Sequence, residues 1–249
     1  MNLFRSNTKY LPYIQIILSI LATASLVYFY NPVWLSLTGI MYVLIAGFGI
    51  SIGYHRYLTH NSFVLKNDKL KWILLWLGCL AGTGSPIGWV AVHRQHHKHS
   101  DNENDPHSPM QIGLKSMIAS YRYVWNPWSV KELLNNHIHR NIHDYYFLLL
   151  FSWLFIAYTI NINLAIYGVI LPTTIAIWVS TISNYLNHKF GYRTYLTDDN
   201  SRNLWYTAIL TFGEGWHNNH HAEPKKYRFG RKWWEVDFGA VIIELFLKK

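Results

Sequence analysis

Residues 33–54 read VWLSLTGIMYVLIAGFGISIGY, and residues 55–60, which follow directly, read HRYLTH. The first stretch contains no Asp, Glu, Lys or Arg, and as a helix it is long enough to cross the roughly 30 Å hydrocarbon core of a bilayer. His55 and His60 then stand where this helix leaves the membrane. The pattern predicts a membrane-spanning helix that brings two imidazoles to the membrane surface.

Three more apolar stretches share this character, so that the predicted spans are 10–30, 33–54, 145–160 and 164–187. The first two are joined only by Asn31-Pro32 and the last two by 161–163, turns short enough to make each pair an antiparallel hairpin. Neither turn is charged, so all 22 Lys and Arg fall on one side, which the positive-inside bias identifies as cytoplasmic. We therefore predict an all-α, multi-pass integral membrane protein with four transmembrane helices and with both termini and the active site on the cytoplasmic side.

The segment 72–92 is apolar as well, but it contains several residues that disfavour a straight helix: Gly78, Gly82, Gly84, Pro86 and Gly88. We predict that it is buried or re-entrant, because a further crossing would separate the later histidines from the first two. The polar and aromatic stretches 93–144 and 189–249 are expected to form a cytoplasmic helical cap. No repeat or linker divides the chain, so residues 1–249 are predicted to form a single domain.

The composition supports the membrane assignment. The chain is 51% hydrophobic and only 14% charged, whereas an ordinary soluble domain is about 25% charged. Its net charge of +9 suits either nucleic acid or an anionic membrane surface, and the apolar spans favour the membrane, so no nucleic-acid partner is expected. Cys79 is the single cysteine, which excludes an intramolecular disulfide and a cysteine zinc site.

Histidines gather in three clusters, which read HRYLTH (55–60), HRQHH (93–97) and HNNHH (217–221). Residues three and four apart on a helix share a face, so each of the last two clusters can point its imidazoles at one place. His55 and His60 are five apart, about 140° on an ideal helix. They either serve two different metals or lie where the helix loosens. Asn184 and His188 form a further i,i+4 pair at the end of the last span.

Imidazole is a good ligand for zinc, iron, copper and nickel. A single cluster of this kind is more often a set of packed or solvated histidines, but three clusters on one side of a membrane indicate a metal site. Nine imidazoles are too many for one ion and suit two. The absence of carboxylates within the clusters distinguishes the pattern from the Glu-rich di-iron bundles.

The three clusters resemble the histidine boxes of the membrane fatty-acid desaturase family, of the acyl-lipid and acyl-CoA delta-9 type. Their surroundings are similar too, in DPH (105–107), NYLNHKFGYR (184–193) and GEGW (213–216). The resemblance covers roughly residues 55–224. It implies an oxidoreductase of lipid metabolism that uses O2 to introduce a cis double bond, at the delta-9 position, into a saturated fatty-acyl chain.

The resemblance also implies the roles of individual residues. Two iron ions, cycling between Fe2+ and Fe3+, would be held by His55, His60, His93, His96, His97, His188, His217, His220 and His221, with Asn184 acting through a water. The carboxylates adjacent to the boxes would orient the ligands; they are Asp101, Asp105 and Glu214. The remaining histidines do not match ligand positions: His99, His107, His137, His139 and His143.

Trp89 matches a tryptophan that lines the bend of the family's acyl tunnel, and Val43 and Gly47 match positions near its closed end. Acyl-CoA members of animals carry Arg-Asp before the second box, where this chain has Ala91 and Val92. This difference favours a glycerolipid-bound acyl chain, although another CoA contact would restore acyl-CoA as the carrier. No His-Pro-Gly-Gly haem segment or GxGxxG fingerprint occurs, so the electrons are expected from a separate protein, ferredoxin or cytochrome b5.

Other interpretations remain open at this point. A di-iron membrane hydroxylase or ketolase acting on an acyl chain, sterol or carotenoid would use the same boxes, and the mass of the product distinguishes it. A metal transporter would place its ligands inside the spans, near the bilayer midplane. A di-zinc hydrolase would usually use carboxylate ligands and an open water site.

Overall fold

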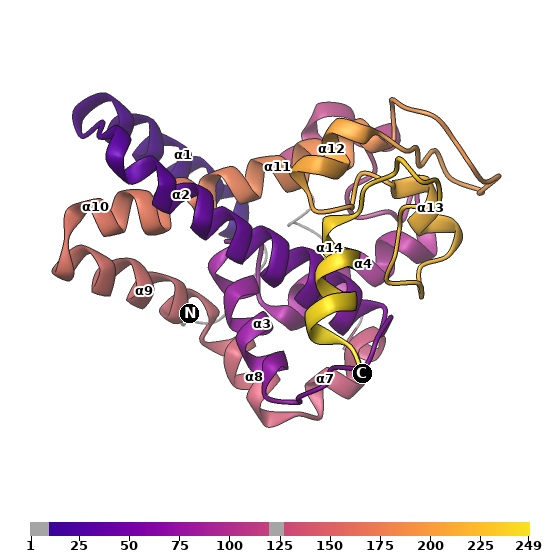
Figure 1. Ribbon diagram of the computed structural model, residues 1–249, viewed down its shortest axis with the longest axis horizontal. Helices are drawn as coiled ribbons and strands as arrows, with labels where there is room; N and C mark the ends of the chain where they lie inside the picture. Colours follow the sequence, from indigo (N-terminus) through magenta and orange to yellow (C-terminus); the bar gives the residue numbers. More distant parts are fainter. Residues whose placement is uncertain (1–9, 120–126) are drawn as a thin grey trace.

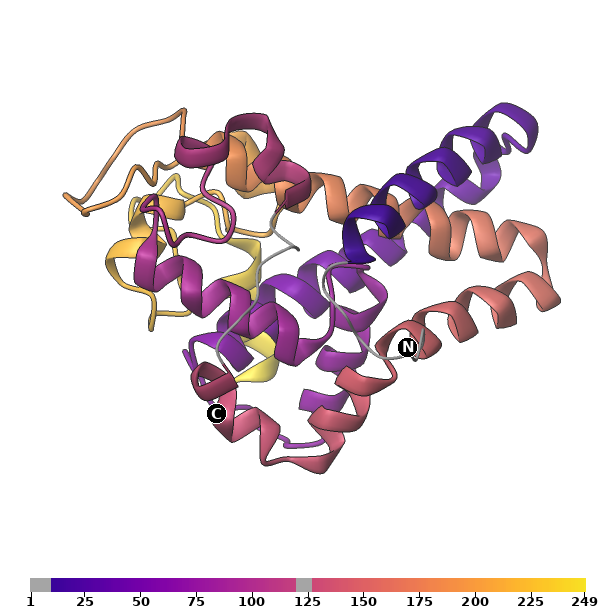
Figure 2. The same cartoon turned by 180° about the vertical axis from the view of Figure 1, so that it is seen from behind.

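The computed structural model describes residues 10–119 and 127–249. Within these residues the regular secondary structure is helical, and β-type pairing is limited to isolated bridges. Long helices project together at one end of the molecule, and short helices and loops gather at the other (Figure 1; Figure 2 from behind). The predicted all-α class is therefore confirmed.

The long helices form the membrane stem: α1 (Leu11–Tyr28), α2 (Leu35–Tyr42) with its π-helical continuation η3 (Val43–Thr59), α9 (Tyr146–Ile160), and α10 (Ile162–Ala165), η7 (Ile166–Ile170) and α11 (Leu171–Asn187) in one line. Three stretches are long and apolar enough to cross a membrane: Leu11–Tyr28, Pro32–Thr59 and Ile162–Asn187. Helix α9 has 15 residues and is about 22 Å long, shorter than the bilayer core of about 30 Å. The fourth predicted span therefore remains a prediction.

Tyr167, in η7, connects the two predicted hairpins. Its hydroxyl donates to the carbonyl of Phe29 at 3.0 Å and accepts from the N–H of Asn31 at 2.5 Å, in the turn of the first hairpin. The Thr38 hydroxyl on α2 donates to the carbonyl of Tyr167 at 2.9 Å. These polar contacts pair groups that would otherwise be unsatisfied in an apolar environment, and they fix α11 against the first hairpin.

The segment 72–92 is a helix–turn–helix that is largely buried. Helix α3 (Leu70–Leu80) packs along η3, α4 (Pro86–His99) returns, and Gly82 and Gly84 make the turn with φ of +73° and +110°. These values strain any residue with a Cβ. The contact with η3 is close, since a Cβ on Gly49 would lie 2.6 Å from the carbonyl carbon of Leu77. The break predicted from the glycines is present, and α4 carries the second histidine cluster.

The remaining α-helices are short; they are α5 (Pro109–Ile112), α6 (Ser116–Ala119), α7 (Lys131–Leu134), α8 (His137–Asp144), α12 (Trp205–Leu210), α13 (His217–Ala222) and α14 (Phe238–Ile242) with its continuation η8 (Ile243–Leu247). Single 3-10 turns occur at η2 (Pro32–Trp34), η4 (Gly113–Lys115) and η6 (Pro127–Val130). Part of the predicted cap, 120–126, lies outside the described residues.

Candidate metal centre

The first histidine pair is brought together by a change of helix type. The N–H of His60 donates to the carbonyl of His55 at 3.2 Å, an i→i+5 bond that closes the π-helix η3. In such a helix residues five apart lie on the same side, and the two rings are 4.8 Å apart. The separation of about 140° expected for an α-helix is therefore wrong. Of the two sequence interpretations, the one in which the helix loosens is correct.

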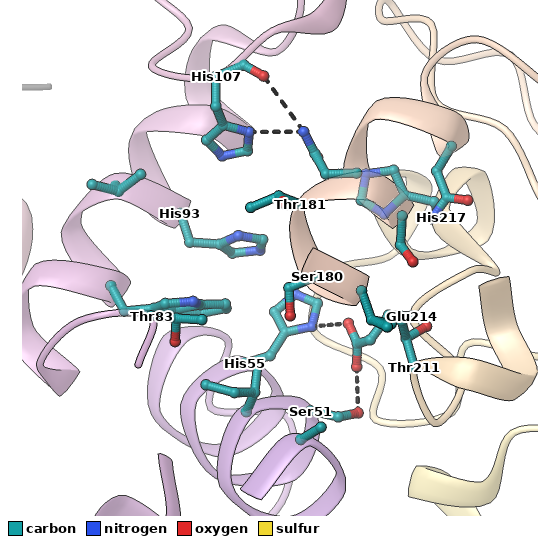
Figure 3. A pocket seen from close by; sticks show the side chains of 18 of the residues that line it. Ser51, His55, Thr83, His93, His107, Ser180, Thr181, Thr211, Glu214 and His217 are labelled. Carbon is teal, nitrogen blue, oxygen red and sulfur yellow. Dashed lines mark hydrogen bonds and ion pairs between the residues drawn. The ribbon is translucent and has the colours of Figure 1, made fainter. Parts of the chain in front are cut away.

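The nine histidines of the predicted ligand set fall into two groups in which the candidate ligand atoms all lie within 4.8 Å of one another. Group A consists of His55, His60, His93, His97 and His220. Group B consists of His96, His188, His217 and His221. The groups are adjacent, because the rings of His97 and His221 lie 4.5 Å apart. Figure 3 shows His55, His93 and His217 pointing into one space from separate helices.

The doublets at the end of the second and third clusters explain this division. Neighbouring residues on a helix differ by about 100° in direction. His96 on α4 belongs to group B and His97 to group A, while on α13 His220 belongs to group A and His221 to group B. Each doublet therefore serves both groups, and α4 and α13 hold them side by side.

Four of the histidines donate their Nδ1 proton to a carboxylate. His96 donates to Asp105 at 2.9 Å and His188 to Asp101 at 2.9 Å. The further pairs are His55 with Glu214 and His221 with Asp199. A carboxylate accepts but does not donate, so in each ring the other nitrogen, Nε2, keeps its lone pair free for a metal. Three of the four carboxylates are those expected from the sequence.

Several Nε2 atoms of different rings lie close to one another. The Nε2 atoms of His55 and His220 are 2.9 Å apart, and those of His188 and His217 are 3.1 Å apart. Buried nitrogens without a hydrogen-bond partner include Nε2 of His60, His96 and His221. Two imidazole nitrogens bound at about 2.1 Å and at right angles on one ion would lie about 3 Å apart. The residues therefore fit two metal ions, one in each group.

The electrostatics of the site favour neutral ligands and charged supports. Burial and the neighbouring imidazoles lower the pKa of His93, His97 and His217 well below the ordinary value, so these rings are neutral, as metal binding requires. Burial alone would raise the pKa of Asp101, but the hydrogen bond from His188 lowers that pKa to about 2. The supporting carboxylates are therefore ionised at neutral pH.

A buried arginine extends the support of group A. The Arg56 side chain is fully buried and lies 3.1 Å from Glu214 and 3.0 Å from Asp237, with its guanidinium 4.0 Å above the ring of Phe229. Asp237 also accepts from the N–H of Ala240 at 2.9 Å, at the start of α14. A chain of ion pairs thus runs from the C-terminal segment through Arg56 and Glu214 to His55.

A largely apolar cavity adjoins both groups. His55 and His93 of group A and His217 of group B line it, together with Asn184 and apolar residues that include Tyr42, Ala46, Ile50, Trp89, Val92 and Val179. Trp89 stacks on His93 with centroids 4.7 Å apart. An apolar wall beside polar ligands is the usual composition of a site for a small apolar molecule.

The positions expected at the closed end of the tunnel, Val43 and Gly47, remain predictions. They are not among the residues that line the cavity, whereas Tyr42 and Ala46, each one residue earlier, are. Val43 is 40% exposed, and a Cβ on Gly47 would lie 3.1 Å from the Phe212 ring.

Asn184 and His107 form a pair that the sequence reading did not anticipate. The Asn184 amide donates to Nδ1 of His107 at 3.0 Å, and the His107 ring stacks on His96 at 4.3 Å. His107 thereby fixes the orientation of an amide in the cavity wall. The sequence shows His107 as the last residue of the motif Asp105-Pro-His107. Its contact with Asn184 depends on the fold and cannot be predicted from that motif.

Asp199 is the other supporting residue that sequence reasoning missed. Asp199 follows a loop that Asn218 connects to α13. The amide oxygen of Asn218 accepts from the N–H groups of Thr194 and Tyr195 in that loop. No spacing signal links Asp199 to His221. Among the other histidines, His139 is buried against Trp72 and His143 bonds to Ser85, both outside groups A and B.

We expect Asp199→Asn and Asp105→Asn each to lower the affinity of group B for iron by about 10- to 100-fold, because the Nδ1–H groups of His221 and His96 lose a negatively charged acceptor and face an amide that can also donate. Equilibrium dialysis with metal analysis measures this change. The matched control is Asp198→Asn at the exposed neighbouring position, which should bind iron like the unaltered protein. Equal affinities in all variants would contradict the supporting role.

Comparison with known proteins agrees with this architecture. Residues 32–248 match the family model described as fatty acid desaturase. The sn-1 stearoyl-lipid 9-desaturase of Anabaena variabilis is 36% identical over 213 residues, covering 83% of this chain and 78% of the relative. Delta-9 acyl-lipid desaturase 2 of Arabidopsis thaliana is 33% identical and covers 83% and 69%. Acyl-CoA 5-desaturase AL21 of Anemone leveillei is 32% identical and covers 90% and 71%.

The chain has long apolar helices, and its clustered imidazoles lie beside an apolar cavity. Its relatives belong to one enzymatic class, the desaturases of fatty-acyl chains. The chain belongs to the fatty acid desaturase family. It is an oxidoreductase of lipid metabolism, and the histidine clusters fit the iron dependence of that family.

Proposed function

We propose that this desaturase introduces a cis double bond at the delta-9 position of a saturated acyl chain carried on a membrane glycerolipid, using two iron ions, O2 and external electrons. The observation that carries the proposal is the position of groups A and B, side by side at the wall of one apolar cavity. An alkyl chain that enters this cavity passes next to both groups. In the balanced reaction the acyl chain loses two hydrogens, the electron donor supplies two electrons, water supplies two protons, and dioxygen leaves as two molecules of water.

Iron bound at groups A and B would supply oxygen activation and hydrogen removal from an unactivated methylene, chemistry that acid–base side chains cannot perform. The protein's own residues position the reactants. Asp101, Asp105, Asp199 and Glu214 hold the Nδ1 protons of four ligands and so fix their ring planes. Trp89, Ile50 and Ala46 line the cavity, where they would exclude water and hold the acyl chain against the ligands.

The position of the double bond and the carrier are proposed from the relatives. The Anabaena and Arabidopsis proteins are named as lipid 9-desaturases, and they cover most of this chain. The Anemone protein is named as an acyl-CoA 5-desaturase, so both features vary among relatives of this similarity. Ala91 and Val92, in place of an Arg-Asp pair, support the lipid-bound substrate.

We also propose that the active site faces the cytoplasm together with both termini, and that ferredoxin or cytochrome b5 delivers the electrons there. Basic residues are exposed on the same side as α13, among them Lys225, Lys226 and Lys232. An acidic redox protein is attracted to such a surface. Lys226 is paired with Glu223 at 2.5 Å, and the ammonium of Lys232 lies 4.4 Å above the ring of Tyr192.

Expression in a host without desaturases tests the proposal, with mass spectrometry of total fatty acids and intact lipids. We expect a new cis-9 monounsaturated chain on a glycerolipid. His96→Ala should abolish it, because group B loses a buried ligand, whereas His99→Ala, outside both groups, should retain it. A product heavier by one oxygen would replace the desaturase proposal by a hydroxylase or ketolase. No product with ferredoxin and its reductase supplied would contradict an acyl substrate.

A further inference from the structure

We propose that two segments of the predicted cytoplasmic cap, 205–212 and Phe238–Leu247, lie within the lipid leaflet beside α2 rather than in water. The partner is the bilayer itself, and the contact surface consists of the outer faces of α12 and of the C-terminal helix. This inference concerns the surface of the molecule and does not depend on the substrate or the reaction.

The first observation is that α12 is inverted. It buries Thr207 and Ala208, which are 2% and 0% exposed, and the Thr207 hydroxyl donates to Asn187 at 2.7 Å. Its large apolar residues face outward, since Trp205, Tyr206, Ile209 and Leu210 are 38–60% exposed. A helix on the surface of a water-soluble domain places its apolar stripe inward. The reversed pattern is stable only where the surroundings are apolar.

The C-terminal helix is apolar on its outer face as well as on its inner face. Ile243 and Leu247 pack inward, while Phe238, Val241, Leu245 and Phe246 are 40–66% exposed. The exposed acid of this helix, Glu244, is paired with Arg228. Large exposed apolar surfaces mark sites of interaction with a protein or a membrane.

Direct contacts make this surface continuous with a membrane span. The hydroxyl of Tyr42, near the middle of the Pro32–Thr59 helix, donates to the carbonyl of Leu210 at 2.6 Å. The Phe212 ring lies 6.1 Å from the Tyr42 ring, and the carbonyl of Phe212 accepts from Gly239 at 3.0 Å. If the long helix crosses the bilayer, its middle lies in hydrocarbon, and the end of α12 lies at the same depth.

The border of the surface has the composition of a membrane interface. Lys248 and Lys249 follow the C-terminal helix directly, and exposed Lys232 precedes exposed Trp233 and Trp234. Lysine and tryptophan together are typical of the headgroup region, where the ammonium reaches anionic lipid and the indole lies at the boundary. This charge arrangement favours lipid over a second copy of the chain, whose identical basic border would repel it.

Site-directed spin labelling tests the inference, because the single cysteine is buried and a Cys79→Ser background leaves no other reactive thiol. In this background Ile209→Cys and Leu245→Cys place labels on the surface. Ile40→Cys, on the exposed side of the span, is the lipid reference, and Leu196→Cys, at a fully exposed loop position, is the water reference. All four side chains are at least 49% exposed, so the substitutions leave the core intact.

The measurement is the collision rate of each label with O2, which concentrates in lipid, and with a neutral nickel chelate, which stays in water, in phosphatidylcholine–phosphatidylglycerol vesicles. We expect the logarithm of their ratio to be positive at positions 209 and 245, as at 40, and negative at 196. Values at 209 and 245 equal to that at 196 would overturn the inference. Shielding of both labels from both reagents would also overturn it, since a protein surface would then cover them.

Discussion

Replacing Arg56 by methionine should destabilise the protein by roughly 3–5 kcal/mol, since the substitution leaves buried carboxylates without their cation. Arg56 and Asp237 are both 0% exposed in their side chains, so water cannot compensate for the lost charge. Glu214 loses the same partner, and through it the orientation of His55 in group A changes. We therefore expect a large drop in the thermal unfolding temperature, accompanied by loss of iron from the detergent-purified protein.

The matched control is Lys226→Met, which removes the ion pair with Glu223 on the surface. The Lys226 side chain is 59% exposed, and exposed pairs contribute only about 0–1 kcal/mol. Arg56→Lys provides a graded variant, because one ammonium cannot reproduce the two-sided contact of a guanidinium. If Arg56→Met were no more destabilising than Lys226→Met, the ion-pair chain would have no structural role.

The parts of this protein that the sequence predicts best depend on periodicity. Uncharged stretches of sufficient length predict the long helices, and the HxxHH spacing predicts that imidazoles share a face. The adjacent histidines at the end of the second and third clusters also indicate the division into groups A and B, because adjacent positions on a helix point about 100° apart. The positions of His96 and His97 in different groups follow from that rule once α4 is known to be a helix.

The parts that the sequence does not predict depend on tertiary contacts or on unusual backbone geometry. Nothing in HRYLTH signals an i→i+5 helix, and this geometry brings the rings of His55 and His60 together. Asp199 reaches His221 only because a loop folds back. The six residues of α12 are too few for their inverted pattern to stand out in the sequence.

Removing the metal should produce the second large effect, a selective loss of order around groups A and B. A ligand present at about 1,000 times its dissociation constant stabilises the folded state by about 4 kcal/mol, and that amount is lost on chelation. In addition, the Nε2 atoms of His55 and His220, 2.9 Å apart, would no longer be held by a shared ion. Helix α13 has six residues, too few to be stable alone, so its position depends on its contacts, and the bonds from His217, His220 and His221 to the metals would be lost on chelation.

Hydrogen exchange measured by mass spectrometry, with and without an iron chelator, locates this effect. We expect faster exchange in α13 and in the second half of α4, and unchanged exchange in α1, whose contacts are with α11 and do not involve the ligands. The His96→Ala variant is the control: because group B already lacks a ligand, chelation should change its exchange in α13 less than in the unaltered protein. A uniform increase across α1 and α13 would show that the metals stabilise the whole fold. No increase anywhere would show that the protein, rather than the metal, holds the imidazoles in place.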